Sequence, residues 1–80
     1  MKKIKISTPY ITLGQFLKFA DLISSGGETK FYLTENDVHV NQELEVRRGR
    51  KLYPGDQVTV DGKESYMIVR WYQWKFNKYN

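Results

Sequence analysis

The sequence contains no cysteine, only two prolines and a single histidine, and it has no long run of apolar residues. Without cysteine, a disulfide framework and a thiolate metal site are both excluded, and one histidine alone makes no convincing zinc site. A membrane-spanning helix needs about 20 apolar residues, and the basic N-terminal segment lacks the apolar stretch of a signal peptide. We therefore expect a cytoplasmic protein with no metal, no cofactor and no membrane partner.

Groups that would carry catalysis are also missing. The sequence shows no nucleophile–base–acid set, and its scattered Asp and Glu residues are interpreted as surface groups. The turn Ser24-Ser25-Gly26-Gly27 does not have the spacing of the phosphate-binding loop of nucleotide hydrolases. We expect no enzymatic activity and no small-molecule substrate.

The positive charge is concentrated in the second half of the chain. Residues 1–46 hold five Lys/Arg against six Asp/Glu, whereas residues 47–80 hold eight against three, within a total net charge of +4. Clustered cations focus electrostatic potential and release counterions from phosphates, which favours a polyanionic partner. A solubilising surface is the alternative, and charge by itself does not decide between the two.

The length of 80 residues indicates one small domain, 1–80. Lys3 to Ile6 alternate with period two, as in a short strand. Apolar residues spaced i, i+3, i+4 and i+7 predict a helix from Leu13 to Ala20 or Asp21, with Thr12 and Gln15 as a capping box. A second helix is predicted over Glu28–Glu35, ending at Asn36.

The rest of the chain is typical of short strands and tight turns. Val38–Val40 is predicted as a strand, Asn41-Gln42 as a turn, and Leu44 with Val46 as the start of the return strand. A turn at 53–56 precedes a strand with Val58 and Val60. A last strand, 66–71, is expected to set Val58 opposite Tyr66, since this register keeps the apolar faces together. The predicted core includes Phe16, Leu17, Leu33, Val38, Val40, Tyr66 and Trp71.

This order of elements carries a family resemblance. The chain resembles the RNA-binding domain first seen in the fourth protein of the small ribosomal subunit, also called the alpha-L motif. The basic stretch 47–52 and the segment 26–30 look like its stand-alone, YaaA-like subgroup. The match covers roughly residues 10–60. It is carried by Leu13, Phe16, Leu17, Ser24, Ser25, Glu28, Lys30, Leu33, Val38, Val40, Asn41, Gly55, Asp56 and Val58.

The resemblance implies an α+β fold in which a two-helix layer packs on a small, mostly antiparallel sheet. It also implies binding of structured RNA, perhaps ribosomal RNA or a ribosomal particle, through the helix pair and the adjoining loop. The sequence departs from the family where many members carry arginine, at Gly26 and Phe31, and the usual Asn-Gly turn is Asn41-Gln42 here.

The strongest candidate contacts are the cations between residues 47 and 51. Arginine offers a planar fork of donors for phosphate, and Gly49 allows the backbone to turn sharply. A solvated loop with spare charge is the alternative. The candidates in this segment are Arg47, Arg48, Arg50 and Lys51.

Further candidates lie on the helices and the first hairpin. Lys18 and Lys30 would line one groove if the two helices packed side by side. The free amides of a helix N-terminus attract phosphate, although Ser and Gly are also ordinary capping residues there. The remaining candidate RNA contacts are Ser24, Ser25, Phe31, His39 and Asn41.

The C-terminal part, 64–80, combines the last strand with an aromatic and basic tail. Aromatic rings beside cations are what unpaired bases stack on, and large rings also close small cores. The sequence leaves three roles open for Trp74 and Phe76, which are core packing, stacking on RNA bases and binding of a protein partner. A protein-interaction module that uses the tail and a sheet edge is therefore the alternative to RNA binding.

Overall fold

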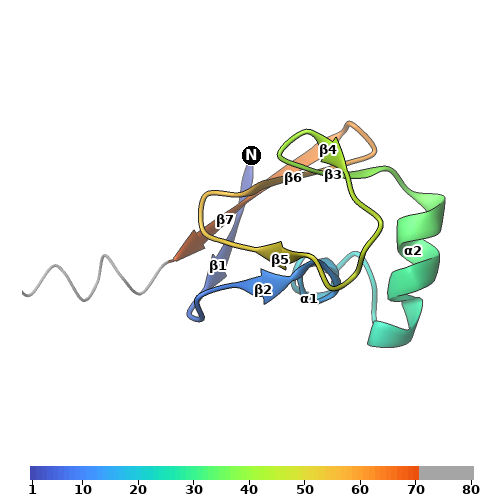
Figure 1. Ribbon diagram of the computed structural model, residues 1–80, viewed down its shortest axis with the longest axis horizontal. Helices are drawn as coiled ribbons and strands as arrows, with labels where there is room; N and C mark the ends of the chain where they lie inside the picture. The colour runs from blue at the N-terminus through green and yellow to red at the C-terminus, as the bar shows by residue number, and fades with distance from the viewer. Residues whose placement is uncertain (71–80) are drawn as a thin grey trace, which may run out of the picture.

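A computed structural model describes residues 1–70 and shows the expected α+β fold, with helices packed on a mostly antiparallel sheet (Figure 1). The predictions for Trp71 and for the tail 72–80 lie outside the described residues. The elements in chain order are β1 (Lys2–Ile6), β2 (Ile11–Thr12), α1 (Leu13–Phe19), the 3-10 helix η1 (Gly26–Glu28), α2 (Thr29–Glu35), β3 (Val38–Val40), β4 (Glu43–Leu44), β5 (Lys51–Leu52), β6 (Gln57–Val60) and β7 (Glu64–Arg70).

Within residues 1–70, the main sheet has five strands in the order β1-β7-β6-β3-β4, and β2 pairs with β5 in a separate two-stranded ribbon. Among these described strands, β1 and β7 pair in parallel, and the other pairings of the main sheet are antiparallel. Val58 lies opposite Tyr66, which confirms the register expected from the apolar faces. Both sheet edges are poor templates for a further strand, because β4 has two residues and β1 carries exposed lysines.

The helices begin and end where local chemistry favours it. Thr12 and Gln15 form the predicted capping box at the start of α1. The second α-helix begins at Thr29, one residue later than expected, because Glu28 belongs to the preceding 3-10 turn. Asn36 ends it as predicted, with its side-chain amide donating to the Tyr32 carbonyl.

The tight turns also agree with the sequence pattern. Asn41 and Gln42 both have positive φ, the conformation that a two-residue hairpin turn requires. Pro54 and Gly55 form the next turn, and the φ of +100° at Gly55 is one that L side chains rarely adopt. The first turn joins β3 to β4 within the main sheet, and the second leads from β5 of the two-stranded ribbon into β6 of the main sheet.

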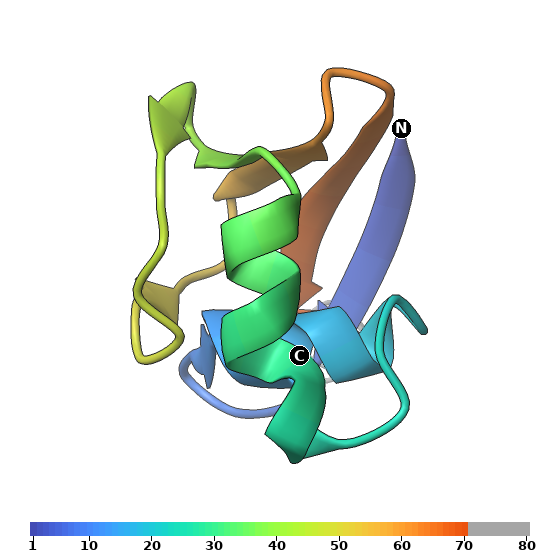
Figure 2. The ribbon, with the colours of Figure 1, turned by 90° about the vertical axis from the view of Figure 1, so that its right-hand side faces the viewer.

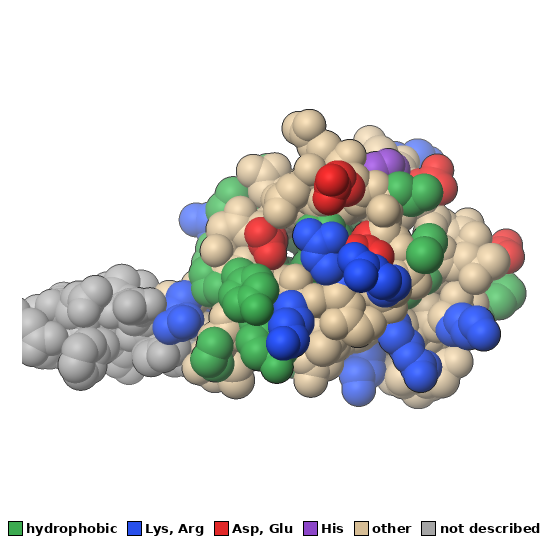
Figure 3. All heavy atoms as spheres, in the orientation of Figure 1, with side chains coloured by type: hydrophobic (Ala, Val, Ile, Leu, Met, Phe, Trp, Pro, Cys, Tyr) green, Lys and Arg blue, Asp and Glu red, His purple; other side chains and the backbone are tan. Residues whose placement is uncertain are grey.

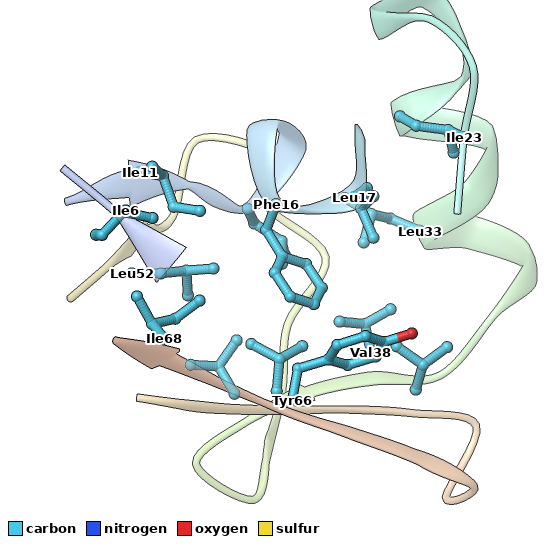
Figure 4. Packing of buried hydrophobic residues seen from close by; sticks show 14 residues of the cluster. Ile6, Ile11, Phe16, Leu17, Ile23, Leu33, Val38, Leu52, Tyr66 and Ile68 are labelled. Carbon is cyan, nitrogen blue, oxygen red and sulfur yellow. The ribbon is translucent and has the colours of Figure 1, made fainter. Parts of the chain in front are cut away.

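The core lies between the helices and the main sheet (Figures 2 and 4). Phe16 points from α1 toward the sheet and meets the ring of Tyr66 edge-on, with the centroids 5.1 Å apart. The predicted core residues of the described part are all buried, and Figure 4 also shows Ile6, Ile11, Ile23, Leu52 and Ile68 there.

Replacing Leu17 by Ala is expected to lower the free energy of unfolding by about 2–5 kcal/mol, since it leaves a cavity in a small, fully buried cluster. Chemical denaturation measures this loss. Lys18→Ala is the matched control: Lys18 is exposed on the same helix, and its loss should change stability by less than about 0.5 kcal/mol. Equal effects of the two substitutions would show that the core does not depend on this face of α1.

One prediction about the return strand is wrong. The strand after the Asn41-Gln42 turn ends at Leu44, and both Leu44 and Val46 are exposed, whereas Glu45 between them is buried. Alternation of apolar residues predicted that Leu44 and Val46 both belong to this strand, whereas Val46 lies beyond its end. The local hydrogen bonds of the Glu45 carboxylate instead make its burial favourable.

Candidate nucleic-acid interface

The basic segment 47–51 connects β4 to β5 and is attached by its backbone to the start of α1. The amide of Leu13 donates to the Arg50 carbonyl over 2.8 Å, and that of Gly14 donates to the Arg48 carbonyl over 2.9 Å. The first amides of a helix have no partner within the helix. The segment supplies these partners and is thereby held against α1.

Gly14 allows the segment, α1 and α2 to come this close. A Cβ at Gly14 would lie 3.4 Å from Cγ2 of Thr29 in α2 and 3.5 Å from the Arg48 carbonyl oxygen. A single methyl group would just fit at ordinary contact distance, whereas a larger side chain would push the basic segment away from the helices.

Glu45 holds the basic segment from the other side. Its carboxylate accepts hydrogen bonds from the backbone amides of Val46 and Arg47, from both Nε and NH2 of Arg47, and from NH1 of Arg50 at 2.8 Å. The whole residue is 5% exposed. Hydrogen bonds from Arg47, then from Arg50, outweigh the cost of burial and lower the pKa of Glu45 to about 2.

The interpretation of every Asp and Glu as a surface group is therefore wrong for Glu45. A buried carboxylate is tolerated only with such a complete set of donors, and the side-chain donors come from residues two and five positions later. A carboxylate just before an Arg-rich stretch was the one signal in the sequence that pointed to this contact.

The four cations of the segment consequently differ in how far their charge is exposed to solvent and free to meet a partner. The Arg50 side chain is 25% exposed and serves mainly as a structural partner of Glu45. The Arg47 side chain is also paired with Glu45 but is 73% exposed, so it still presents charge to the solvent. Arg48 and Lys51 are exposed, and the ion pairs of Glu45 are with Arg47 and Arg50 instead. The segment is therefore not simply a solvated loop with spare charge, since Arg50 is committed to Glu45.

Lys30 of α2 and Arg48 of the basic segment converge on one surface hollow, together with Val46. The two cations are 18 positions apart in sequence, so only the fold brings them to the same hollow. Figure 3 shows Lys and Arg side chains spread over this face, from the β4–β5 connection toward α2. We call the surface formed by Lys30, Arg47, Arg48 and Lys51 the basic face.

The remaining candidates are placed around this face rather than within it. Lys18 is exposed in the last turn of α1 but does not line the hollow beside Lys30. Ser24 and Ser25 are exposed before η1, where the Ser25 hydroxyl contacts Glu28 at 3.5 Å. Phe31 is one of the most exposed large side chains.

His39 and Asn41 belong to the first hairpin. The histidine is half-buried, and Figure 3 shows it at the upper edge of the view, above the central basic cluster. The Asn41 side chain donates to Asp56 and accepts from the amide of Gln57, both at 3.0 Å. Its amide therefore ties the hairpin to the turn before β6, which accounts for Asn41 without an RNA contact.

Within residues 1–70, no group of three or more His, Asp or Glu side chains is arranged to hold a metal ion. No helix in the same range is long and apolar enough to cross a membrane.

Comparison with known proteins identifies the family of this chain. A model of the S4 domain matches residues 4–69, which is most of the chain. The chain belongs to the S4 domain family. Among similar proteins, the probable ribosome maturation protein RlbA of Bacillus subtilis (strain 168) is 56% identical over 66 residues, covering 82% of this chain and 93% of that protein. The family resemblance read from the residues is confirmed. The matched residues 4–69 include all four cations of the basic face.

Proposed function

We propose that this S4 domain binds structured RNA through the basic face, without catalysing a reaction, and that its target is ribosomal RNA in a maturing ribosomal particle in the cytoplasm. The observation that carries the proposal is the convergence of Lys30 and Arg48 from distant parts of the chain. The similarity to a probable ribosome maturation protein supports the choice of RNA.

The proposed mechanism is neutralisation of phosphates on a surface of fixed shape. Structured RNA is recognised largely by shape and by its backbone, so the spacing of the cations matters as much as their number. Here two fixed supports set that spacing: the backbone bonds to α1 and the buried Glu45 carboxylate. RNA binding then needs little further ordering of the segment, which favours affinity.

The interaction-module alternative receives no support from the described sheet edges, because β4 is short and β1 is lined by lysines. Its other component, the tail 72–80, lies outside the described residues.

A salt titration tests the proposed function. Each phosphate contact contributes about 0.7–0.9 to the slope of log affinity against log salt. Lys30→Ala combined with Arg48→Ala should therefore reduce the slope by roughly 1.5 for a structured ribosomal RNA fragment. These two positions are chosen because neither is bonded to Glu45, so the anchor of the segment stays intact.

The matched control removes the same charge elsewhere. Lys3→Ala combined with Lys63→Ala changes β1 and the β6–β7 turn, and should leave the slope close to that of the wild type. A slope that falls equally in both double variants would show that only net charge matters, and a wild-type affinity independent of salt would contradict RNA binding by phosphate neutralisation.

A further inference from the structure

Two tyrosines and a lysine gather where β2 pairs with β5. The antiparallel register sets Ile11 opposite Leu52 and Thr12 opposite Lys51. It also brings together the residues just outside the ribbon, so that the rings of Tyr10 and Tyr53 lie 5.6 Å apart between centroids, tilted by 45°. The Lys51 ammonium lies 4.9 Å from the centre of the Tyr10 ring.

These rings face outward. Ile11 and Leu52 beside them are buried in the core, whereas Tyr10 is 38% and Tyr53 48% exposed. Figure 3 shows apolar side chains over β2 and β5, next to a cationic side chain, on the same face of the molecule as the central basic cluster. The rings thus extend the basic face with an aromatic surface.

A hollow of about 560 Å³ adjoins Tyr10, and its size lies in the range of small-ligand sites. Its lining also includes Lys5, the exposed Phe19, and Thr12 and Gln15, whose side chains form the capping box of α1. The hollow therefore combines aromatic residues, polar side chains and a positive charge.

We propose that Tyr10, Tyr53 and Lys51 form a stacking site for an unpaired RNA nucleotide. Every base has a π-face that stacks on an aromatic ring, and a nearby cation compensates the attached phosphate. The bases inside a duplex are already stacked, so this site is specific for a single-stranded element beside the structured part. The proposal rests on the proposed function and adds to it the kind of RNA that is bound.

Two matched RNAs test the site: a blunt hairpin, and the same hairpin with a short single-stranded extension. The wild type should bind the extended hairpin more tightly. Tyr10→Leu combined with Tyr53→Leu should remove that advantage, a loss of roughly 5- to 150-fold for one stacked base, and should bind the blunt hairpin as the wild type does. Tyr10→Phe, which keeps a ring, should retain the preference.

Leu44→Ala is the control, because it removes an exposed apolar side chain in β4 and should change neither affinity. Wild-type binding to both hairpins without preference would overturn the stacking site alone, as would an unchanged preference in the double Leu variant. Binding to neither RNA, or binding that is independent of salt, would overturn the proposed function itself.

Photocrosslinking of the wild type covers the case in which the double variant does not fold. With 4-thiouridine in the extension, crosslinked peptides containing Tyr10 or Tyr53 are expected. Crosslinks confined to other residues would overturn the proposal.

Discussion

Lys30→Glu combined with Arg48→Glu is expected to weaken binding to structured RNA by about 100-fold or more. A hydrogen bond to a charged group contributes about 1.5–3 kcal/mol, and about 1.4 kcal/mol is a tenfold change in affinity. Both residues border the same hollow, so two negative charges would face the same stretch of phosphates. The loss should exceed that of the corresponding Ala variant, because repulsion is added to the lost contacts. Fluorescence anisotropy with a labelled RNA at two salt concentrations measures it.

Two further variants show whether the effect belongs to this face. Lys3→Glu with Lys63→Glu makes the same change in net charge on other elements and should weaken binding far less. Shortening the chain after Trp71 should also have a smaller effect than charge reversal. If the truncation abolished partner binding and the Lys30 and Arg48 substitutions were silent, the interaction-module alternative would be correct.

Glu45→Ala is expected to lower the free energy of unfolding by about 1–3 kcal/mol and to weaken RNA binding as well, although it removes a negative charge. The carboxylate accepts bonds from both backbone and side chain of Arg47 and from Arg50, so its removal leaves these donors without their partner. The basic segment would then lose one of its two supports. An affinity that rises after this substitution would show that charge, and not the shape of the segment, limits binding.

The same carboxylate predicts a pH dependence. Folding lowers the pKa of Glu45 from 4.5 to about 2, so the unfolded chain takes up the proton first as the solution is acidified. The contribution of Glu45 to stability is complete above about pH 4.5 and disappears as the pH falls toward 2. Thermal melts between pH 6 and 2 should show a shallower decline for Glu45→Gln than for the wild type. Glu43→Gln, at an exposed neighbouring position, is the control and should follow the wild type.

Local sequence patterns were sufficient to predict most of the secondary structure and its turns. The capping box at Thr12, the Asn36 helix end, and the turns at Asn41-Gln42 and Pro54-Gly55 depend on residues within a few positions of one another. The pairing of Val58 with Tyr66 followed from period-two alternation, since only one register keeps both apolar faces on the core side. The family resemblance added the order in which these elements pack.

The arrangement of the basic face and of the tyrosine pair could not be predicted in this way, because it depends on contacts between residues that no local sequence pattern relates. Alternation around Leu44 and Val46 predicted a strand that continues past Leu44 and did not predict the burial of Glu45, because that burial depends on how Arg47 and Arg50 fold back onto the carboxylate. The meeting of Lys30 with Arg48, and of Tyr10 with Tyr53, joins residues separated by many positions.

By itself, then, the sequence determined the elements, the turns, the register and the cationic composition of the basic segment. All of these follow from backbone preferences and from the separation of apolar and polar faces. The tertiary structure decided which cations stay available and which rings meet. Those outcomes depend on docking the basic segment onto the first amides of α1 and pairing β2 with β5, contacts that exist only once the chain has folded.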